Sequence, residues 1–267
     1  MKKLFLLFFL LLVSISLTAQ EDGTLLNPFP KEAFKAGEWL EFRIHYGVFN
    51  ASRVTLELQA DTLDRVPVFH ATGYGRTTGL ARLFFKVEDH YQSYFGQKDG
   101  LPRWFIRDIN EGGYTKDLEI RFNHNTKTAF VNDKKNNRKG DFTIKDNVQD
   151  LISAFYYLRN YYDTSHLTKG EEVLINMFFD EENYLFKLRF LGREKIETKF
   201  GRIKTLKFRP FVQSGRVFNE QESVTLWISD DDNKVPIKVR ANLRIGSIEC
   251  DLENFKNLRH PFKIEIY

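Results

Sequence analysis

The chain has 267 residues, with 40 lysines and arginines against 36 aspartates and glutamates, and so a formal net charge of +4. Hydrophobic residues make up 42% and charged residues 28% of it, a composition typical of a folded core and not of intrinsic disorder. This charge balance excludes a strongly basic nucleic-acid binder, and no nucleic-acid partner is expected.

Residues 1–20 read as a secretory signal peptide, because a short basic start precedes an apolar run over 4–17. Removing Lys2 and Lys3 leaves 38 basic residues against 36 acidic ones, which is a net charge of +2. The sequence around Ala19 resembles the end of Bacteroidetes signal peptides, which predicts a mature protein in the periplasm; cleavage after Ala19 or after Gln20 stays open. No second apolar run approaches the ~20 residues that span a bilayer, so no transmembrane segment is expected after cleavage.

Alternation of apolar and polar residues dominates the remaining chain. In residues 39–46 every second side chain is apolar, which is the period of a half-buried strand. The pattern recurs, in chain order, at 54–58, 118–122, 185–190, 203–208 and 235–240. Short turns separate these runs and favour an antiparallel meander. We therefore predict a mainly β protein, a curved antiparallel sheet or incomplete β-barrel of about eleven or twelve strands, with residues 21–267 forming a single domain.

Two segments break this rhythm. The stretch 147–162 has apolar residues at helical spacing, with Asn147 as the expected N-cap and Asp150 in the first turn. This one main helix is expected to cover the hollow side of the sheet. The segment 77–85 predicts a short helix or an apolar loop.

Several short motifs resemble the DUF3108 family of exported bacterial proteins. They are Gly37-Glu38-Trp39-Leu40, residues 46–52, 85–89 and 150–159, Phe200-Gly201-Arg202-Ile203-Lys204-Thr205, residues 226–231 and Val235-Pro236-Ile237. The resemblance covers roughly residues 37–252. It implies a fold like that of the LolA and LolB lipoprotein carriers, a curved and incomplete barrel with helical cover, and it implies no established reaction.

No catalytic motif is present, and the six histidines are scattered, with no two at metal-ligand spacing on one element. We therefore expect no catalytic residues, no metal site, no cofactor and no enzymatic activity. The single cysteine, Cys250, lies in phase with apolar neighbours and is expected to be an inert core thiol. The run 230–233 is expected to be a solvated turn, and the basic loop 134–140 a charged hairpin tip or a contact for anionic headgroups.

Aromatic residues make up 15% of the chain, and they either fill the core or line a ligand cavity. If a cavity exists, the candidate lining residues are Leu80, Leu83, Phe84, Phe85, Trp104, Phe155 and Tyr156. Polar residues expected to act as structural anchors are Asp89, Asp150, Ser153 and Arg159. Because a buried charge is costly unless paired, Arg159 is expected to pair with a carboxylate such as Asp89.

Three functional hypotheses follow. The first is an exported periplasmic binding or carrier-like module for an apolar ligand such as a lipid or acyl chain, with peripheral membrane contact. The second is a non-catalytic structural or interaction protein of the cell envelope, whose C-terminal residues 262–267 close the barrel edge or pair with another chain. The third is an enzyme with an unrecognised, dispersed site.

Overall fold

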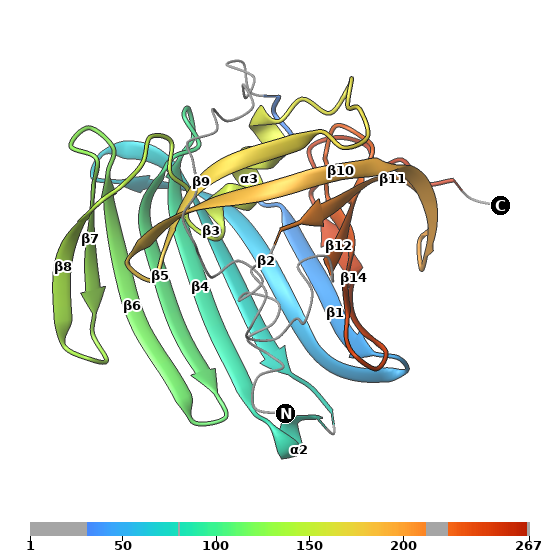
Figure 1. The fold of residues 1–267 in the computed structure, drawn as a ribbon, viewed down its shortest axis with the longest axis horizontal. Helices are drawn as coiled ribbons and strands as arrows, with labels where there is room; N and C mark the ends of the chain where they lie inside the picture. The colour runs from blue at the N-terminus through green and yellow to red at the C-terminus, as the bar shows by residue number, and fades with distance from the viewer. Residues whose placement is uncertain (1–30, 80, 212–223, 266–267) are drawn as a thin grey trace.

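The computed structural model describes residues 31–79, 81–211 and 224–265, so the predicted signal peptide and Leu80 lie outside the described part. Fourteen strands form one sheet (Figure 1). They are β1 (Trp39–Tyr46), β2 (Phe49–Leu63), β3 (Val66–Thr77), β4 (Val87–Gly96), β5 (Pro102–Glu111), β6 (Tyr114–Asn123), β7 (Thr128–Asp133), β8 (Arg138–Thr143), β9 (Glu172–Phe179), β10 (Glu182–Thr198), β11 (Gly201–Pro210), β12 (Val224–Ser229), β13 (Pro236–Asn242) and β14 (Ser247–Lys256). The described residues also form two helices, α2 (Ala81–Phe84) and α3 (Ser153–Tyr161).

The sheet is a meander, and each strand pairs antiparallel with its neighbour. It runs from β8 back to β1, continues through β14, and ends at β9. The end strands do not pair with each other, so the sheet is curved but not closed. Residues 144–149 run between them: Gln149 forms a parallel bridge with Met177 of β9, and the Asn183 side chain donates to the carbonyl of Thr143 over 2.7 Å.

The predicted fold class is thus confirmed, with more strands than the eleven or twelve expected. Strand β8 illustrates why the pattern underestimates the number. Its six residues include charged side chains and a single large apolar one, Phe142, so no alternation marks it.

The main core lies on the hollow side of the sheet, where the inward side chains of β3–β7 and β9–β11 meet α3. Figure 1 shows the strands curving around α3, with β9 and β10 crossing the open side. A second apolar cluster lies between β1, β13, β14 and the β10–β11 hairpin and includes the buried thiol of Cys250. No helix in the described part of the chain is long and apolar enough to cross a membrane.

Helix α3 begins at Ser153, six residues after the predicted N-cap. Asn147 has a φ of +51° and is not helical. Instead, the Asp150 carboxylate accepts the backbone N–H groups of Ile152 and Ser153 at 2.8 and 2.7 Å. Asp150 therefore satisfies the free donors at the start of the helix, and the apolar residues before it belong to an extended segment.

The described residues of the C-terminal segment, up to Glu265, do not pair with β8 or β9, the two end strands of the sheet. Glu265 exchanges two backbone hydrogen bonds with Arg202, of 2.9 and 3.1 Å, beside the β10–β11 turn. The hypothesis that residues 262–267 close the sheet edge is therefore wrong for the part up to Glu265.

Candidate functional site

A small cavity of about 60 Å³ lies between α3 and the strands β10–β13. Its apolar lining comprises Phe155, Leu158, Tyr162, Leu188, Phe208, Leu226, Ile228 and Pro236. Arg159, Thr164 and Lys234 complete the lining. Typical ligand pockets hold ~300–1,000 Å³, so a ligand with more than a few heavy atoms must displace some of these side chains.

The hydroxyl of Tyr162 is the unusual group in this lining. Tyr162 is 6% exposed, and its buried hydroxyl oxygen has no hydrogen-bond partner among the described residues. Leaving a buried polar group without a hydrogen bond destabilises the fold by about 1–3 kcal/mol. A hydrogen-bond partner that reaches this hydroxyl therefore gains free energy by binding there. Tyr162 contributes to the cavity lining, but its hydroxyl oxygen is itself buried, so a polar atom in the cavity reaches it only after neighbouring side chains move.

Two buried cations stand at one end of the cavity and are both held by hydrogen bonds. Arg159 donates to both oxygens of Glu38, at 2.6 and 2.8 Å, and through Nε to the carbonyl of Asn233 at 2.9 Å. Lys234 donates from Nζ to the carbonyls of Arg159 and Tyr162 at the end of α3. Burial lowers the pKa of Lys234 to about 8.

The other end of α3 is fixed by a buried polar contact with the sheet. Ser93 on β4 donates to Asp150 over 2.6 Å, and both side chains are fully buried. Burial raises the pKa of Asp150 to about 6, against the opposing effect of the hydrogen bonds that it accepts. The helix is therefore anchored at both of its ends, with the cavity beside its second half.

A separate group of buried ionisable residues lies on the inner face of β4 and β5. Burial raises the pKa of Asp89. Burial, together with the hydrogen bond that the protonated Glu111 carboxyl donates to Asp89, raises the pKa of Glu111 to about 8. Arg107, 1% exposed, forms an ion pair of 2.7 Å with Asp180 in the β9–β10 turn and contacts the ring of Phe179. This group does not line the cavity described above.

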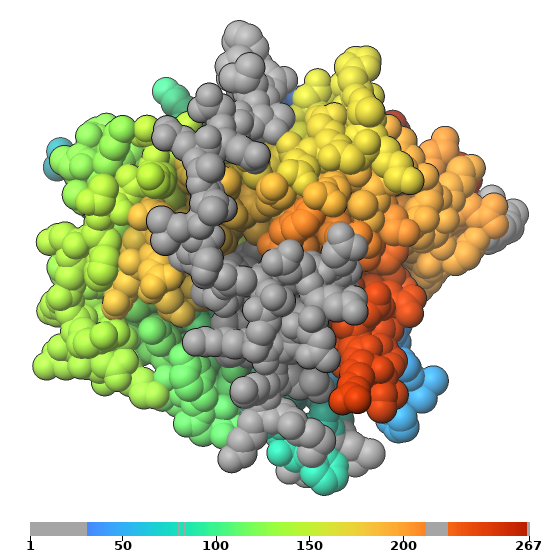
Figure 2. All heavy atoms as spheres, in the orientation of Figure 1, coloured from blue at the N-terminus to red at the C-terminus, as the bar shows by residue number. Residues whose placement is uncertain are grey.

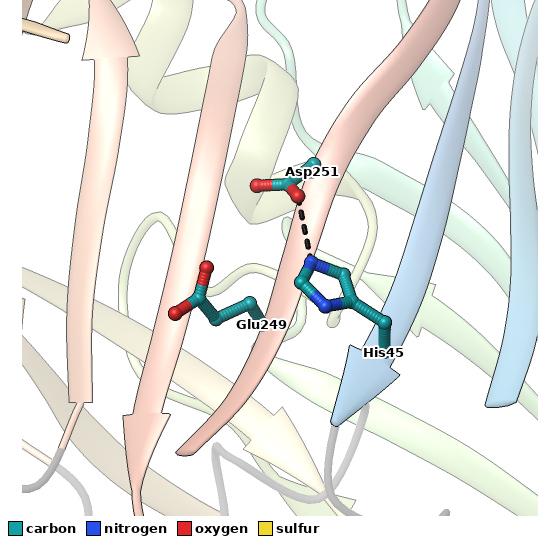
Figure 3. Close-up of side chains that lie close together, drawn as sticks. All are labelled: His45, Glu249 and Asp251. Carbon is teal, nitrogen blue, oxygen red and sulfur yellow. Dashed lines mark hydrogen bonds and ion pairs between the residues drawn. The ribbon is translucent and has the colours of Figure 1, made fainter. Parts of the chain in front are cut away.

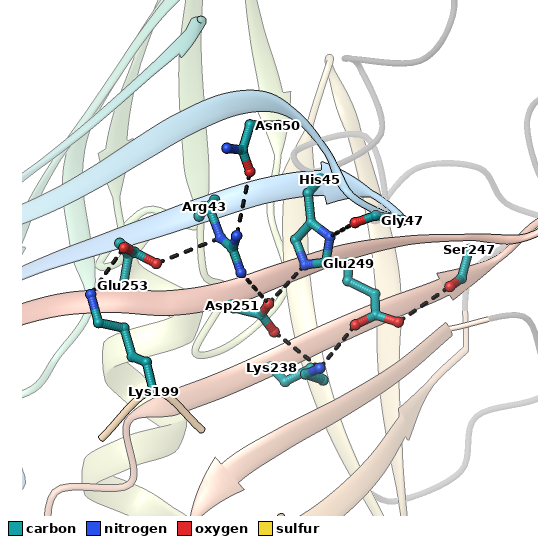
Figure 4. Close-up of polar contacts among 10 residues, drawn as sticks. All are labelled: Arg43, His45, Gly47, Asn50, Lys199, Lys238, Ser247, Glu249, Asp251 and Glu253. Carbon is teal, nitrogen blue, oxygen red and sulfur yellow. Dashed lines mark hydrogen bonds and ion pairs between the residues drawn. The ribbon is translucent and has the colours of Figure 1, made fainter. Parts of the chain in front are cut away.

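The outer face of β1, β14 and β13 has an ion-pair network (Figure 4). Asp251 is at its centre: it contacts His45 Nε2 at 2.8 Å, Lys238 Nζ at 3.2 Å and Arg43 Nη2 at 3.4 Å. The same lysine pairs with Glu249 at 2.9 Å. Arg43, Lys238 and Asp251 also line a polar depression of about 270 Å³.

Three of these residues satisfy the spacing of metal ligands. His45, Glu249 and Asp251 each place one ligand atom within 4.8 Å of the others (Figure 3). The Lys238 ammonium and the Arg43 guanidinium already neutralise the two carboxylates, so an ion would have to displace a cation of the chain. We interpret the network as an ion-paired outer surface of the sheet, and the absence of a metal site stays a prediction.

The structure brings only part of the predicted cavity set to the cavity. Phe155 lines it, whereas the buried Tyr156 ring packs against Phe34 and Phe95 in the main core. Phe84 is 81% exposed, and Phe85 lies against the Gly112 turn. The Leu83 side chain, like Leu80, lies outside the described part.

Trp104 is on the opposite face of the sheet from the cavity, so its predicted place in the lining is wrong. Its neighbour Phe105 is the inward residue of β5, and alternation turns Trp104 outward. There the indole stacks on Tyr94 with ring centroids 5.0 Å apart, and the Arg121 guanidinium lies 3.7 Å from the indole centroid.

The four predicted anchors are all buried, but the predicted partner of Arg159 is wrong. Arg159 pairs with Glu38, while Asp89 accepts the backbone N–H of Asn110 and hydrogen-bonds Glu111. Asn233 and Lys234 are buried, so the predicted solvated turn at 230–233 is wrong for Asn233. Glu38 belongs to a family motif and Tyr162 to the predicted helix, but no sequence pattern marked them or Lys234 as site residues, because their environments arise from segments far apart in the chain.

Comparison with solved structures agrees with the fold. A beta-barrel-like protein with a domain of unknown function, DUF1849, from Brucella abortus has a TM-score of 0.53 and 7% identity, covering 88% of this chain and 100% of that one. At that identity the likeness shows the fold alone. A DUF1089 family protein from Pseudomonas aeruginosa has 12% identity in an alignment that covers 70% of this chain and 88% of that one. Its TM-score of 0.37 is too low to show a shared fold.

None of the curated proteins matches the chain in sequence. A family model described as "Protein of unknown function (DUF3108)" matches residues 41–253, which include every strand except the beginning of β1 and the end of β14. The chain belongs to the DUF3108 family.

Proposed function

We propose that this protein is an exported, periplasmic binding or carrier-like module for a small apolar ligand that has one polar group. The cavity beside α3 is the proposed site. The observation that carries the proposal is this mostly apolar cavity, whose lining includes Tyr162 with its buried, unpaired hydroxyl. An apolar pocket with a few convergent polar groups is the usual form of a ligand site.

One of the two buried cations at the end of the cavity supports a ligand of this kind. Arg159 is neutralised by Glu38, whereas Lys234 donates only to backbone carbonyls, so Lys234 contributes a positive potential without having to release a hydrogen bond. The ligand class that fits is an amphiphile whose hydroxyl or carboxyl group reaches Tyr162 and whose apolar part displaces side chains around Leu226. A short acyl chain meets this description.

A binding assay with a dansyl-labelled fatty acid tests the proposal. We expect saturable fluorescence enhancement, displaced by unlabelled fatty acid, for the wild-type protein. The substitution Ile228→Trp fills the cavity and should weaken binding at least tenfold, whereas Ile106→Trp, at a half-buried position on the outer face of β5, should leave it unchanged. Equal binding by the two variants, or no saturable binding by the wild type, would contradict the proposal.

The Tyr162→Phe variant separates ligand recognition from folding. It removes an unpaired hydroxyl, so the free energy of unfolding of the ligand-free protein should stay the same or rise by up to ~1 kcal/mol. Binding of the fatty acid should nevertheless weaken. A loss of stability in the ligand-free protein would show that the hydroxyl has a partner within the chain and would remove the main support for the site.

A further inference from the structure

Large apolar side chains are exposed mainly at one end of the sheet. Because neighbouring strands are antiparallel, the turns β1–β2, β3–β4, β5–β6, β7–β8 and β13–β14 all lie at this end. Nine large apolar side chains are exposed among the described residues, and six of them lie here. We call these six the apolar rim: Tyr46, Val48, Phe49, Phe84, Tyr114 and Ile245, exposed by 39, 89, 72, 81, 48 and 78%.

The most exposed members of the apolar rim lie on adjacent turns. The Tyr46 hydroxyl donates to the carbonyl of Ile245 over 3.0 Å, which joins the β1–β2 turn to the β13–β14 turn. The N–H of Thr78 donates to the carbonyl of Ala51 over 3.0 Å, which places the segment before α2 beside β2. Figures 1 and 2 show these turns and α2 along the lower edge of the molecule. These contacts place the β1–β2 turn, the β13–β14 turn and the segment before α2 side by side at this end of the sheet.

The same turns have cations and no acidic residue. Residues 47–50, 78–86, 112–113, 134–137 and 243–246 contain Arg82, Lys86, Lys134, Lys135 and Arg244, five cations against no carboxylate. The turns at the opposite end are 64–65, 97–101, 124–127, 199–200 and 230–235, with five aspartates and five cations. The β9–β10 turn also points toward the apolar rim, and its Asp180 and Glu181 are paired with Arg107 and Arg138. Two of the five cations are likewise paired, Lys86 with Glu88 at 3.4 Å and Lys134 with Glu119.

We propose that the apolar rim docks the protein on the surface of an anionic lipid bilayer. Apolar and aromatic tips flanked by lysine and arginine suit the interface, where the tips enter the acyl boundary and the cations meet the headgroups. A rim with an excess of cations in its turns and separate apolar tips matches a fluid anionic surface better than a pocketed protein partner. This inference does not depend on the cavity, since a rim that binds lipid does so whether or not a ligand is carried.

Sedimentation with vesicles tests this inference. The protein is used with its N-terminal segment removed by the expressing cell, verified by mass spectrometry, because the apolar run 4–17 would itself bind lipid. We expect binding to vesicles of phosphatidylglycerol and phosphatidylethanolamine that falls with added salt, and much weaker binding to phosphatidylcholine vesicles. No binding to the anionic vesicles would overturn the proposal.

Matched variants at the two ends of the sheet make the test specific. The double variant Phe49→Asp/Ile245→Asp should weaken vesicle binding at least tenfold, whereas Val66→Asp, an exposed apolar position at the opposite end, should change it less than twofold. Arg244→Glu should weaken binding about fivefold or more, against little change for the exposed Lys98→Glu at the opposite end. Circular dichroism confirms that each variant is folded. Equal effects at the two ends would also overturn the proposal.

Discussion

The buried ion pair between Glu38 and Arg159 should be the most sensitive single contact outside the apolar core. Glu38 is fully buried and Arg159 is 3% exposed, and two hydrogen bonds of 2.6 and 2.8 Å join them. The pair connects the residue before β1 to α3, and the same guanidinium binds the carbonyl of Asn233 in the β12–β13 turn. Three segments far apart in sequence therefore depend on one carboxylate.

The substitution Glu38→Gln keeps the volume of the side chain and removes its charge. The guanidinium then remains buried without a counter-charge, and breaking such a pair from one side costs about 3–5 kcal/mol. For a chain of this size each kcal/mol lowers the melting temperature by roughly 2–4 °C, so a decrease of about 10 °C is expected. Urea unfolding followed by circular dichroism measures the free energy, and a thermal scan measures the melting temperature.

An exposed ion pair provides the control. Asp146 and Lys127 pair at 2.9 Å with side chains 72% and 56% exposed, so Asp146→Asn should cost less than ~1 kcal/mol. The double substitution Glu38→Leu with Arg159→Met should recover much of the stability lost in Glu38→Gln, because it leaves no unpaired charge. A loss below ~1 kcal/mol for Glu38→Gln, equal to that of the control, would refute the reasoning.

Three further predictions concern the other buried polar groups. Asp150→Ala should cost about 2–4 kcal/mol in urea unfolding, because it removes the acceptor of two helix-start N–H groups and of the Ser93 hydroxyl; a cost below ~1 kcal/mol would contradict this role. Burial raises the pKa of Glu111 to about 8, so as the pH rises the unfolded chain loses the carboxyl proton before the folded chain does. The free energy of unfolding should therefore fall between about pH 4.5 and 8, by at most ~1.4 kcal/mol per pH unit. Glu111→Gln should flatten this decrease, and a variant with the wild-type pH profile would contradict the assignment. Burial lowers the pKa of Lys234 to about 8, so above that pH the unfolded chain binds more protons than the folded one, and the free energy of unfolding should rise from pH 8 toward 10.5. In the Lys234→Met variant this rise should disappear. A rise of the same slope in the variant would exclude Lys234 as its cause.

The sheet was predictable from the sequence because its signal is local. In β1, residues 40, 42 and 44 are buried and the residues between them are not, as the alternation predicted. The same local rule fails for Trp104 because it requires the correct phase of the strand. One position along, Phe105 is the buried residue, and a large aromatic side chain does not by itself indicate which face it occupies.

The polar interior was not predictable, because it depends on contacts over long sequence separations. Arg159 was recognisable as a buried cation, but its partner lies 121 residues away on the chain, and Asp89 was an equally acceptable carboxylate by sequence. Lys234 belongs to a turn rich in aspartate that reads as solvated, yet its ammonium binds carbonyls at the end of α3, where helix geometry leaves them free. Only the tertiary arrangement makes these environments polar and buried.

The position of α3 constrains how a ligand can reach the proposed site. Asp150 fixes the start of the helix to β4, and Arg159 with Lys234 fixes its end to the N-terminal segment and the β12–β13 turn. Lifting the helix would break charged hydrogen bonds at both ends, whereas moving side chains around Leu226 and Ile228 breaks none of these contacts. Entry by side-chain displacement between β10 and β13 is therefore the less costly route. A ligand held there would lie against a fixed helix, with its polar group directed to the unpaired hydroxyl of Tyr162.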